Sequence, residues 1–267
     1  MLLIGESING TIPKVGKAIL EKDKEYIQEL AIAQKEMGAD FLDVNGGIAE
    51  GNESEDLSWI VRVVQESVDL PLMIDSANPD AIKKAISFYN HKIPPFINSI
   101  SAETKKWKAM HPVIKGKDYK IVALCLGDKG IPPTVKGRVE IAQNLYDRLT
   151  QIGVKPENIY FDPLVMPIST DSKAALVTLD TIKILKDRFP SSKTICGVSN
   201  ISMGLPLRSL INRNFLTMAL LNGLDVLLMD VRDKAMISNL LAAQLLLGED
   251  NYGLNYIKAF RSKILIS

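Results

Sequence analysis

Residues 72–101 read LMIDSANPDAIKKAISFYNHKIPPFINSIS and contain one complete repeat of the pattern that runs through the chain. Two short apolar runs, at 72–76 and 96–101, are too brief for amphipathic helices and suit strands buried on both faces. Between them, Asn78 is a candidate N-cap and Pro79 occupies the first helical position, which together predict a helix. The stretch therefore predicts a strand, a helix and a second strand.

The same pattern recurs along the whole chain. The other apolar runs are LLIGES (2–7), FLDVNG (41–46), KIVALCL (120–126), IYFDPLV (159–165), KTICGVSN (193–200) and VLLMDV (226–231). Successive runs begin 24 to 39 residues apart, which leaves room for a loop, a helix and a return. Between two of them, KEYIQELAIAQKEMG has the pattern of a helix that ends at Gly38.

Eight strand–helix units without a break in composition predict an α/β fold, a single TIM-type (β/α)8 barrel over residues 1–267. An open, doubly wound sheet would use the same alternation. However, no G-x-G-x-x-G follows the first strand, and the chain contains no Walker A sequence. These absences favour the barrel.

Composition argues against several classes of protein. The chain has 32 Lys and Arg against 31 Asp and Glu, a formal net charge of +1, so no global field attracts nucleic acid or an anionic membrane. No run reaches about 18 apolar residues, and MLLIGESING enters a strand pattern without an export signal. Cys125 and Cys196 lie in apolar strand runs, where thiols pack as small hydrophobes. We expect a soluble, cytoplasmic protein that binds neither nucleic acid nor membrane.

Polar side chains end almost every predicted strand. In a parallel barrel the carboxyl ends of the strands form one mouth, where barrel enzymes place their chemistry. The side chains are Glu6, Asn9, Asp43, Asn45, Asp75, Asn98, Ser101, Asp162, Ser199, Asn200, Asp230 and Asp233. Any one of them could equally cap a helix or close a turn. Together they predict a mouth that suits a neutral ligand with paired N–H donors and carbonyl acceptors, such as a pterin.

The residues offer little for metal or triad chemistry. His91 and His111 lie in segments that read as helix or loop, and the two cysteines are far apart in the sequence. We therefore expect no tightly bound metal, although the carboxylates could hold a weakly bound cation. Neither histidine is placed beside a strand-end nucleophile, which argues against a Ser or Cys triad.

Six segments together resemble one enzyme family. They are MLLIGESIN, FLDVNGG, PLMIDS, INSIS, YFDPLVMP and GVSNISMGLPLRSLINRNFL. The family is that of the methyltetrahydrofolate-dependent corrinoid methyltransferases, whose pterin-binding barrel is of the dihydropteroate synthase type. The most specific motifs are G-E-x-I-N and G-x-S-N followed by L-I-N-R-x-F-L. The resemblance implies transfer of a methyl group between N5 of (methyl)tetrahydrofolate and the cobalt of a corrinoid.

The resemblance also implies which residues bind the substrate. Asp75, Asn98 and Asp162 match residues that hydrogen-bond the amino-pyrimidine edge and ring nitrogens of the pterin. Arg208 is expected to meet the folate tail or a ring substituent. Met203 stands where relatives often have a glutamine, which suggests a different subgroup.

Asn200 matches an asparagine beside N5 of the folate and is the candidate catalytic residue. A methylated amine is a poor leaving group, so N5 must be protonated or strongly hydrogen-bonded when its methyl group passes to cobalt. An amide can stabilise protonated N5 without delivering the proton itself. Gly197 and Ser199 are expected to shape the same strand end. The positions expected to line the mouth, or only to organise its loops and water, are Glu6, Asn9, Asp43 and Ser101.

The corrinoid is expected to come from a separate protein. The chain has no D-x-H-x-x-G, the lower-ligand motif of many cobalamin-binding domains, so the complex with the corrinoid protein should be transient. The family also implies a homodimer formed through outer helices. Both directions of transfer pass through one transition state. Met203 and the general resemblance favour transfer from the methylcorrinoid to tetrahydrofolate in a demethylation pathway.

Other functions stay open from the residues alone. A dihydropteroate synthase would share the barrel and the pterin site, but neither GESING nor GVSN supplies its N-V-T-P-D-S-F loop or the cationic residues for a diphosphate leaving group. A protein that only stores or senses reduced folate would need the same binding residues. A phosphosugar enzyme would need a Gly-rich phosphate loop, which G-V-S-N and D-V-R-D fit poorly.

Overall fold

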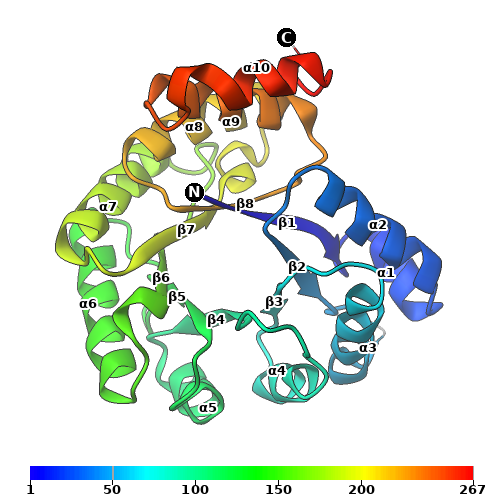
Figure 1. Ribbon diagram of the computed structural model, residues 1–267. Helices are drawn as coiled ribbons and strands as arrows, with labels where there is room; N and C mark the ends of the chain where they lie inside the picture. The colour runs from blue at the N-terminus through cyan, green and yellow to red at the C-terminus, as the bar shows by residue number, and fades with distance from the viewer. Residues whose placement is uncertain (50, 267) are drawn as a thin grey trace.

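A computed structural model, which describes residues 1–49 and 51–266, has eight parallel strands in a closed barrel ringed by helices (Figure 1). The strands are β1 (Leu2–Asn9), β2 (Phe41–Asn45), β3 (Leu72–Asp75), β4 (Phe96–Ser101), β5 (Lys120–Leu124), β6 (Ile159–Asp162), β7 (Lys193–Gly197) and β8 (Val226–Met229). Each strand pairs with the next, and β8 pairs with β1 to close the barrel. The barrel is the fold predicted from the apolar runs, and each strand begins at the residue where a run begins.

The helices follow the strands in chain order. They are α1 (Pro13–Leu20), α2 (Lys24–Glu36), α3 (Glu53–Gln65), α4 (Pro79–Ile86), α5 (Thr104–Ile114), α6 (Val135–Gln151), α7 (Ala174–Arg188), α8 (Arg208–Leu221), α9 (Lys234–Leu246) and α10 (Leu254–Arg261). Short 3-10 helices are η1 (Pro156–Asn158), η2 (Val198–Ser202) and η3 (Asn251–Gly253). Helices α1 and α10 are additional to the eight predicted units; α10 lies next to α9 in Figure 1. No helix of the described ranges is long and apolar enough to cross a membrane.

Helix ends follow the predicted local chemistry. The side chain of Asn78 accepts a hydrogen bond from the backbone N–H of Asp80 at 3.0 Å, and Pro79 begins α4, as the sequence predicted. Helix α2 ends just before Gly38, whose φ of 90° lies in the left-handed region that favours glycine. These signals confirm that the apolar runs are separated by helices.

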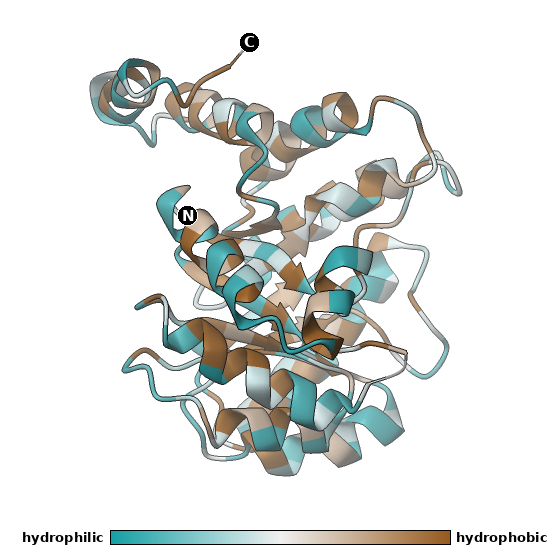
Figure 2. Cartoon of the chain, turned by 90° about the vertical axis from the view of Figure 1, so that its right-hand side faces the viewer, coloured by the Kyte–Doolittle hydropathy of each residue, from teal (hydrophilic) through white to brown (hydrophobic). Residues whose placement is uncertain are grey.

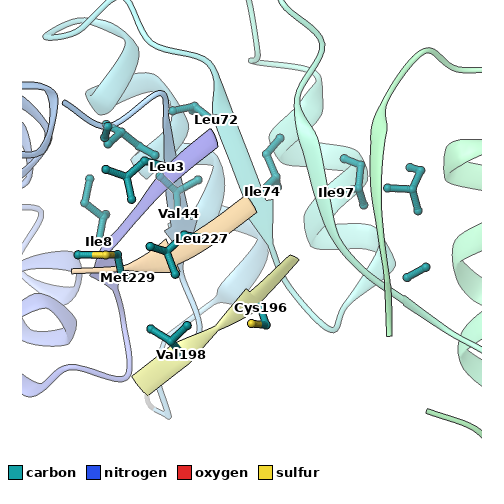
Figure 3. Close-up of a cluster of buried hydrophobic side chains, with 14 of the residues drawn as sticks. Leu3, Ile8, Val44, Leu72, Ile74, Ile97, Cys196, Val198, Leu227 and Met229 are labelled. Carbon is teal, nitrogen blue, oxygen red and sulfur yellow. The ribbon is translucent and has the colours of Figure 1, made fainter. Parts of the chain in front are cut away.

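The barrel wall separates two apolar cores. The inner core takes one residue from each strand: Ile4, Phe41, Met73, Phe96, Val122, Tyr160, Ile195 and Val226. In it, the ring of Phe96 packs edge-on against Phe41 and Tyr160, with centroids 4.9 and 4.6 Å apart. The outer core fills the space between strands and helices and includes Cys196 beside Val198 and Leu227 (Figure 3). In Figure 2 the interior strands are largely hydrophobic, while the surrounding helices mix hydrophobic and hydrophilic residues.

A polar layer lies above the inner core. Because side chains alternate along a strand, the residue two positions beyond each inner-core residue faces the same interior, one layer nearer the carboxyl end. We call this layer the mouth ring; it consists of Glu6, Asp43, Asp75, Asn98, Leu124, Asp162, Gly197 and Leu228. Five of the eight carry a carboxyl or amide group. The barrel interior therefore changes from apolar side chains in the inner core to mostly polar side chains in the next layer.

Candidate active site

Three carboxyl groups of the mouth ring lie on the consecutive strands β1, β2 and β3. Asp43 is 2% exposed, and its Oδ1 is buried without a hydrogen-bond partner among the described residues. Burial, and then the charges of Asp75 and Glu6, raise the pKa of Asp43 well above its ordinary value. Burial, and then the charge of Asp230, raise the pKa of Glu6 to about 7. A pKa of about 7 leaves the Glu6 carboxyl partly protonated at neutral pH, so this group can donate as well as accept a hydrogen bond.

Asp75 is oriented by its neighbours on both sides. Strand register places Asn45 on one side of it and Asn98 on the other. Nδ2 of Asn45 donates to Oδ2 of Asp75 at 2.9 Å, while Oδ1 of Asn45 accepts from the N–H of Gly47 at 2.8 Å. Burial raises the pKa of Asp75, and the hydrogen bond from Asn45 opposes this. The sequence marked Asn45 as a strand-end residue but assigned it no role; in the structure its amide holds one oxygen, Oδ2, of the Asp75 carboxylate.

Asp162 ends β6, on another part of the mouth ring. Its Oδ1 accepts from the N–H of Leu164 at 2.7 Å, and Leu164 has a φ of 66°. Burial raises the pKa of Asp162 to about 6, opposed by this hydrogen bond and by the charge of Arg138. Arg138, from α6, is 2% exposed and donates to the carbonyl groups of Pro163 at 2.9 Å and Leu164 at 2.8 Å. Arg138 thus holds the turn that carries Asp162.

Sequence reasoning missed Arg138. It lies in a helical segment with several other polar residues, and its sequence position resembles that of a surface arginine. Buried arginines are rare and need partners, which here come from a loop 25 and 26 residues away. A local sequence pattern could not reveal those partners.

Asn200 lies on a turn at the rim of the barrel. Ser199 and Asn200 belong to η2, Met203 follows that turn, and Arg208 begins α8. Asn200 is exposed, and within the described ranges its side chain makes no hydrogen bond. Arg208 donates to the carbonyl of Ser199 at 2.8 Å and to the hydroxyl of Ser202 at 3.1 Å. The catalytic candidate therefore presents a free amide on a turn whose backbone is held.

Asn9 and Ser101 have local partners. Oδ1 of Asn9 accepts from the N–H of Thr11 at 2.9 Å and from its hydroxyl at 2.7 Å. The buried hydroxyl of Ser101 donates to Oε2 of Glu103 at 2.7 Å. Both side chains thus organise the loops that follow β1 and β4. Their contact with folate stays a prediction.

Asp230 supplies the charge that acts on Glu6. Its Oδ1 accepts from the hydroxyl of Ser7 at 3.0 Å, and Arg232 donates to both of its oxygens at 2.9 and 3.0 Å. Burial alone would raise the pKa of Asp230, but the hydrogen bonds from Arg232 and Ser7 outweigh it and lower the pKa. Asp230 is therefore an anion at neutral pH, and its charge favours the protonated form of Glu6.

We expect Glu6→Gln to change how stability depends on pH. The folded-state pKa of Glu6 is about 7 against an ordinary value of 4.5, so its contribution is fully present below about pH 4.5 and is lost as the pH rises through 7. Relative to the variant, the wild-type free energy of unfolding should fall by about 3 kcal/mol between pH 4.5 and 8. Urea denaturation of both proteins across this range measures the difference; parallel curves would contradict it.

One cavity of the described surface lies away from the mouth ring. A cavity of about 820 Å³ lies at the opposite end of the barrel, next to the segments that lead into β2, β3 and β4, and includes Asp40, Asp69 and His91. It contains none of the predicted site residues. Across residues 1–49 and 51–266, no group of three or more His, Cys, Asp or Glu side chains could hold a metal ion.

Known proteins resemble this chain in sequence. A family model described as pterin binding enzyme matches residues 6–230. A methylcorrinoid:tetrahydrofolate methyltransferase of Eubacterium limosum is 38% identical over 98% of this chain and 96% of that protein. A methionine synthase of Mycobacterium leprae is 29% identical over 84% of this chain, which matches only 20% of that protein.

Solved structures agree on the fold alone. Dihydropteroate synthase from Xanthomonas albilineans, in complex with 7,8-dihydropteroate, has a TM-score of 0.67 at 16% identity and covers 92% of each chain. The corresponding Yersinia pestis enzyme has a TM-score of 0.68 at 14% identity, over 92% of this chain and 94% of that one. The family model and the nearly full-length relative show the family. This chain belongs to the pterin-binding enzymes, in the family of folate–corrinoid methyltransferases predicted from its motifs.

Proposed function

We propose that the protein transfers a methyl group from a methylcorrinoid, carried on a separate protein, to N5 of tetrahydrofolate. The observation that carries this proposal is the 38% identity, over 98% of the chain, to a methyltransferase named for that reaction. The mouth ring has matching chemistry, because its carboxyl and amide groups suit a neutral ring with adjacent donors and acceptors.

The pterin ring would bind against three of the mouth-ring residues. Oδ1 of Asp75 is the oxygen that Asn45 leaves for a ligand, and it would accept from an N–H group of the amino-pyrimidine edge. Asn98 can donate and accept beside it, and Asp162 would take part from β6. Asp43, on the neighbouring strand β2, has a buried oxygen that no donor of the described residues reaches.

Methyl transfer would take place beside Asn200. The lone pair of N5 attacks the methyl carbon, the electron pair of the cobalt–carbon bond stays on the metal as Co(I), and the N5–H proton must leave. At the transition state N5 gains positive charge, so the amide oxygen of Asn200 would accept a hydrogen bond from N5–H and stabilise that charge. Solvent then takes the proton, because an amide is not a base at neutral pH.

The reaction requires an encounter with a second protein. A corrinoid must reach the rim where Asn200 is exposed and then leave, so the complex with its carrier protein is transient.

For the homodimer, we propose α10 as part of the contact, because Leu254, Ile257 and Phe260 are 64%, 43% and 70% exposed and lie on one helical face. We place the protein in the cytoplasm, where its buried thiols stay reduced.

Reconstitution with purified components tests the proposal. We expect the protein to convert tetrahydrofolate and a methylated corrinoid protein into 5-methyltetrahydrofolate and Co(I) corrinoid in equal amounts, followed by the cobalt absorption spectrum. Folate binding without any change at cobalt would instead indicate a storage or sensing protein. Condensation of a pterin diphosphate with p-aminobenzoate would indicate a dihydropteroate synthase.

Asp75→Asn should weaken folate binding before it affects chemistry. The substitution replaces an acceptor-only carboxylate with an amide, so one oxygen that would face ligand N–H groups loses its charge or becomes a donor. We expect about a tenfold higher dissociation constant for tetrahydrofolate by calorimetry. Asp80→Asn, which removes the same charge from the exposed first turn of α4, is the control. Wild-type affinity in Asp75→Asn would exclude this contact.

A further inference from the structure

Arg208 reaches back over the turn that carries Asn200. Nη2 of its guanidinium donates to the carbonyl of Ser199 at 2.8 Å, and Nε donates to the hydroxyl of Ser202 at 3.1 Å. That hydroxyl in turn donates to the Ser199 carbonyl at 3.3 Å. These three contacts close a ring of hydrogen bonds around the backbone from 199 to 202. Asn200 lies inside the closed segment.

The turn needs this support because it lacks helix caps and contains an unfavourable backbone conformation. No side chain caps the start of η2, and none caps α8. Leu207, just before Arg208, has a φ of 50°, a left-handed conformation that is unfavourable for leucine. A charged, planar guanidinium forms stronger and better-oriented hydrogen bonds than a neutral donor, and it can span two acceptors at once.

A second set of contacts ties the same turn to the loop after β6. The N–H of Ile168 donates to the carbonyl of Ile201 at 3.0 Å. The hydroxyl of Ser169 donates to the carbonyl of Met203 at 2.7 Å. The backbone on both sides of Asn200 is therefore held, while the Asn200 side chain itself stays free for a ligand. A catalytic amide placed in this way is preorganised by its supports.

We propose that Arg208 is a positioning residue for methyl transfer: it holds η2 so that the amide of Asn200 faces N5, and it acts through Asn200 rather than by binding the folate tail. The inference rests on the proposed function, since the role of Asn200 comes from it. It differs from the role implied by the family motif, because two guanidinium nitrogens are already engaged with the turn.

The two roles can be separated with a substrate that lacks the tail. Steady-state kinetics of Arg208→Ala would be measured with tetrahydrofolate and with 6-methyltetrahydropterin, which has no p-aminobenzoylglutamate. A positioning role lowers kcat about tenfold with both substrates and leaves KM nearly unchanged. A rise in KM confined to tetrahydrofolate would overturn the proposal. Arg188→Ala, an exposed arginine at the end of α7, should behave as wild type.

A double-mutant cycle tests the dependence on Asn200. If Arg208 acts through Asn200, Arg208→Ala should change the rate less than twofold in an Asn200→Ala background. A tenfold loss in both backgrounds would show independent action and overturn the proposal. Arg208→Lys, which keeps the charge but not the planar fork, should recover part of the rate.

Hydrogen exchange provides a readout that needs no activity. In Arg208→Ala the amides of residues 199–203 should exchange at least tenfold faster than in wild type, while those of the barrel strands stay unchanged. Unchanged exchange in this segment would overturn the proposal, and faster exchange everywhere would show general destabilisation instead of a positioning role. Wild-type protein that transfers no methyl group to tetrahydrofolate would refute the proposed function, a result distinct from all of these.

Discussion

Asn200→Ala is expected to lower the single-turnover rate of methyl transfer about a hundredfold, or by roughly 3 kcal/mol, with folate binding close to wild type. The physical reason is that N5 gains positive charge only as the methyl group moves, so a hydrogen bond to N5–H is worth most at the transition state. Asn200 suits this role because its amide is exposed and free while the backbone of its turn is held.

A second substitution at position 200 makes the test of this role more specific. Asn200→Asp keeps an oxygen that can accept from N5–H, so it should retain more activity than Asn200→Ala. Rapid-quench measurement of 5-methyltetrahydrofolate, with enzyme in excess, separates chemistry from product release. Asn144→Ala, on the exposed face of α6, is the matched control and should transfer at the wild-type rate. An unchanged single-turnover rate in Asn200→Ala would eliminate the assigned role.

Arg138→Met is expected to lower the free energy of unfolding by about 3 kcal/mol. Methionine can replace the apolar stem of the side chain but none of its donors. The carbonyl groups of Pro132, Pro163 and Leu164 would then lose the hydrogen bonds that Arg138 now gives them. Arg138 supplies a donor to each of these three carbonyl groups; the contact with Pro163 is buried and the other two are partly buried, so losing all three donors is destabilising.

Arg138→Met should also weaken the binding of tetrahydrofolate. Loss of the positive charge removes one influence that lowers the pKa of Asp162, and loss of the hydrogen bonds frees the turn that holds its carboxylate. Urea denaturation gives the stability, and calorimetry with tetrahydrofolate should show weaker binding. Lys136→Met, on the same helix but 88% exposed at its side chain, should leave both unchanged. A wild-type unfolding midpoint in Arg138→Met would contradict the argument.

Much of the fold was predictable because strand burial leaves a local trace. All eight strands begin where an apolar run begins, since both faces of a barrel strand are covered. The ends were less predictable: the run at 193–200 continues into η2, because Val198 is as buried as the strand itself. Helix α10 was not identified, because it is short and exposes Leu254 and Phe260 instead of burying an apolar face.

The candidate site, like the fold, was predictable only in part. The apolar runs were enough to assign Glu6, Asp43, Asp75, Asn98 and Asp162 to the strands, and the strand period of two then places them in one ring. The hydrogen bonds of these groups and the directions of their pKa shifts depend on how the chain folds. The pairing of Asn45 with Asp75 spans 30 residues, and Arg138 reaches Leu164 across 26. Burial and distance between remote segments set these properties, because desolvation and Coulomb interactions depend on proximity in space and leave no periodic pattern in the chain.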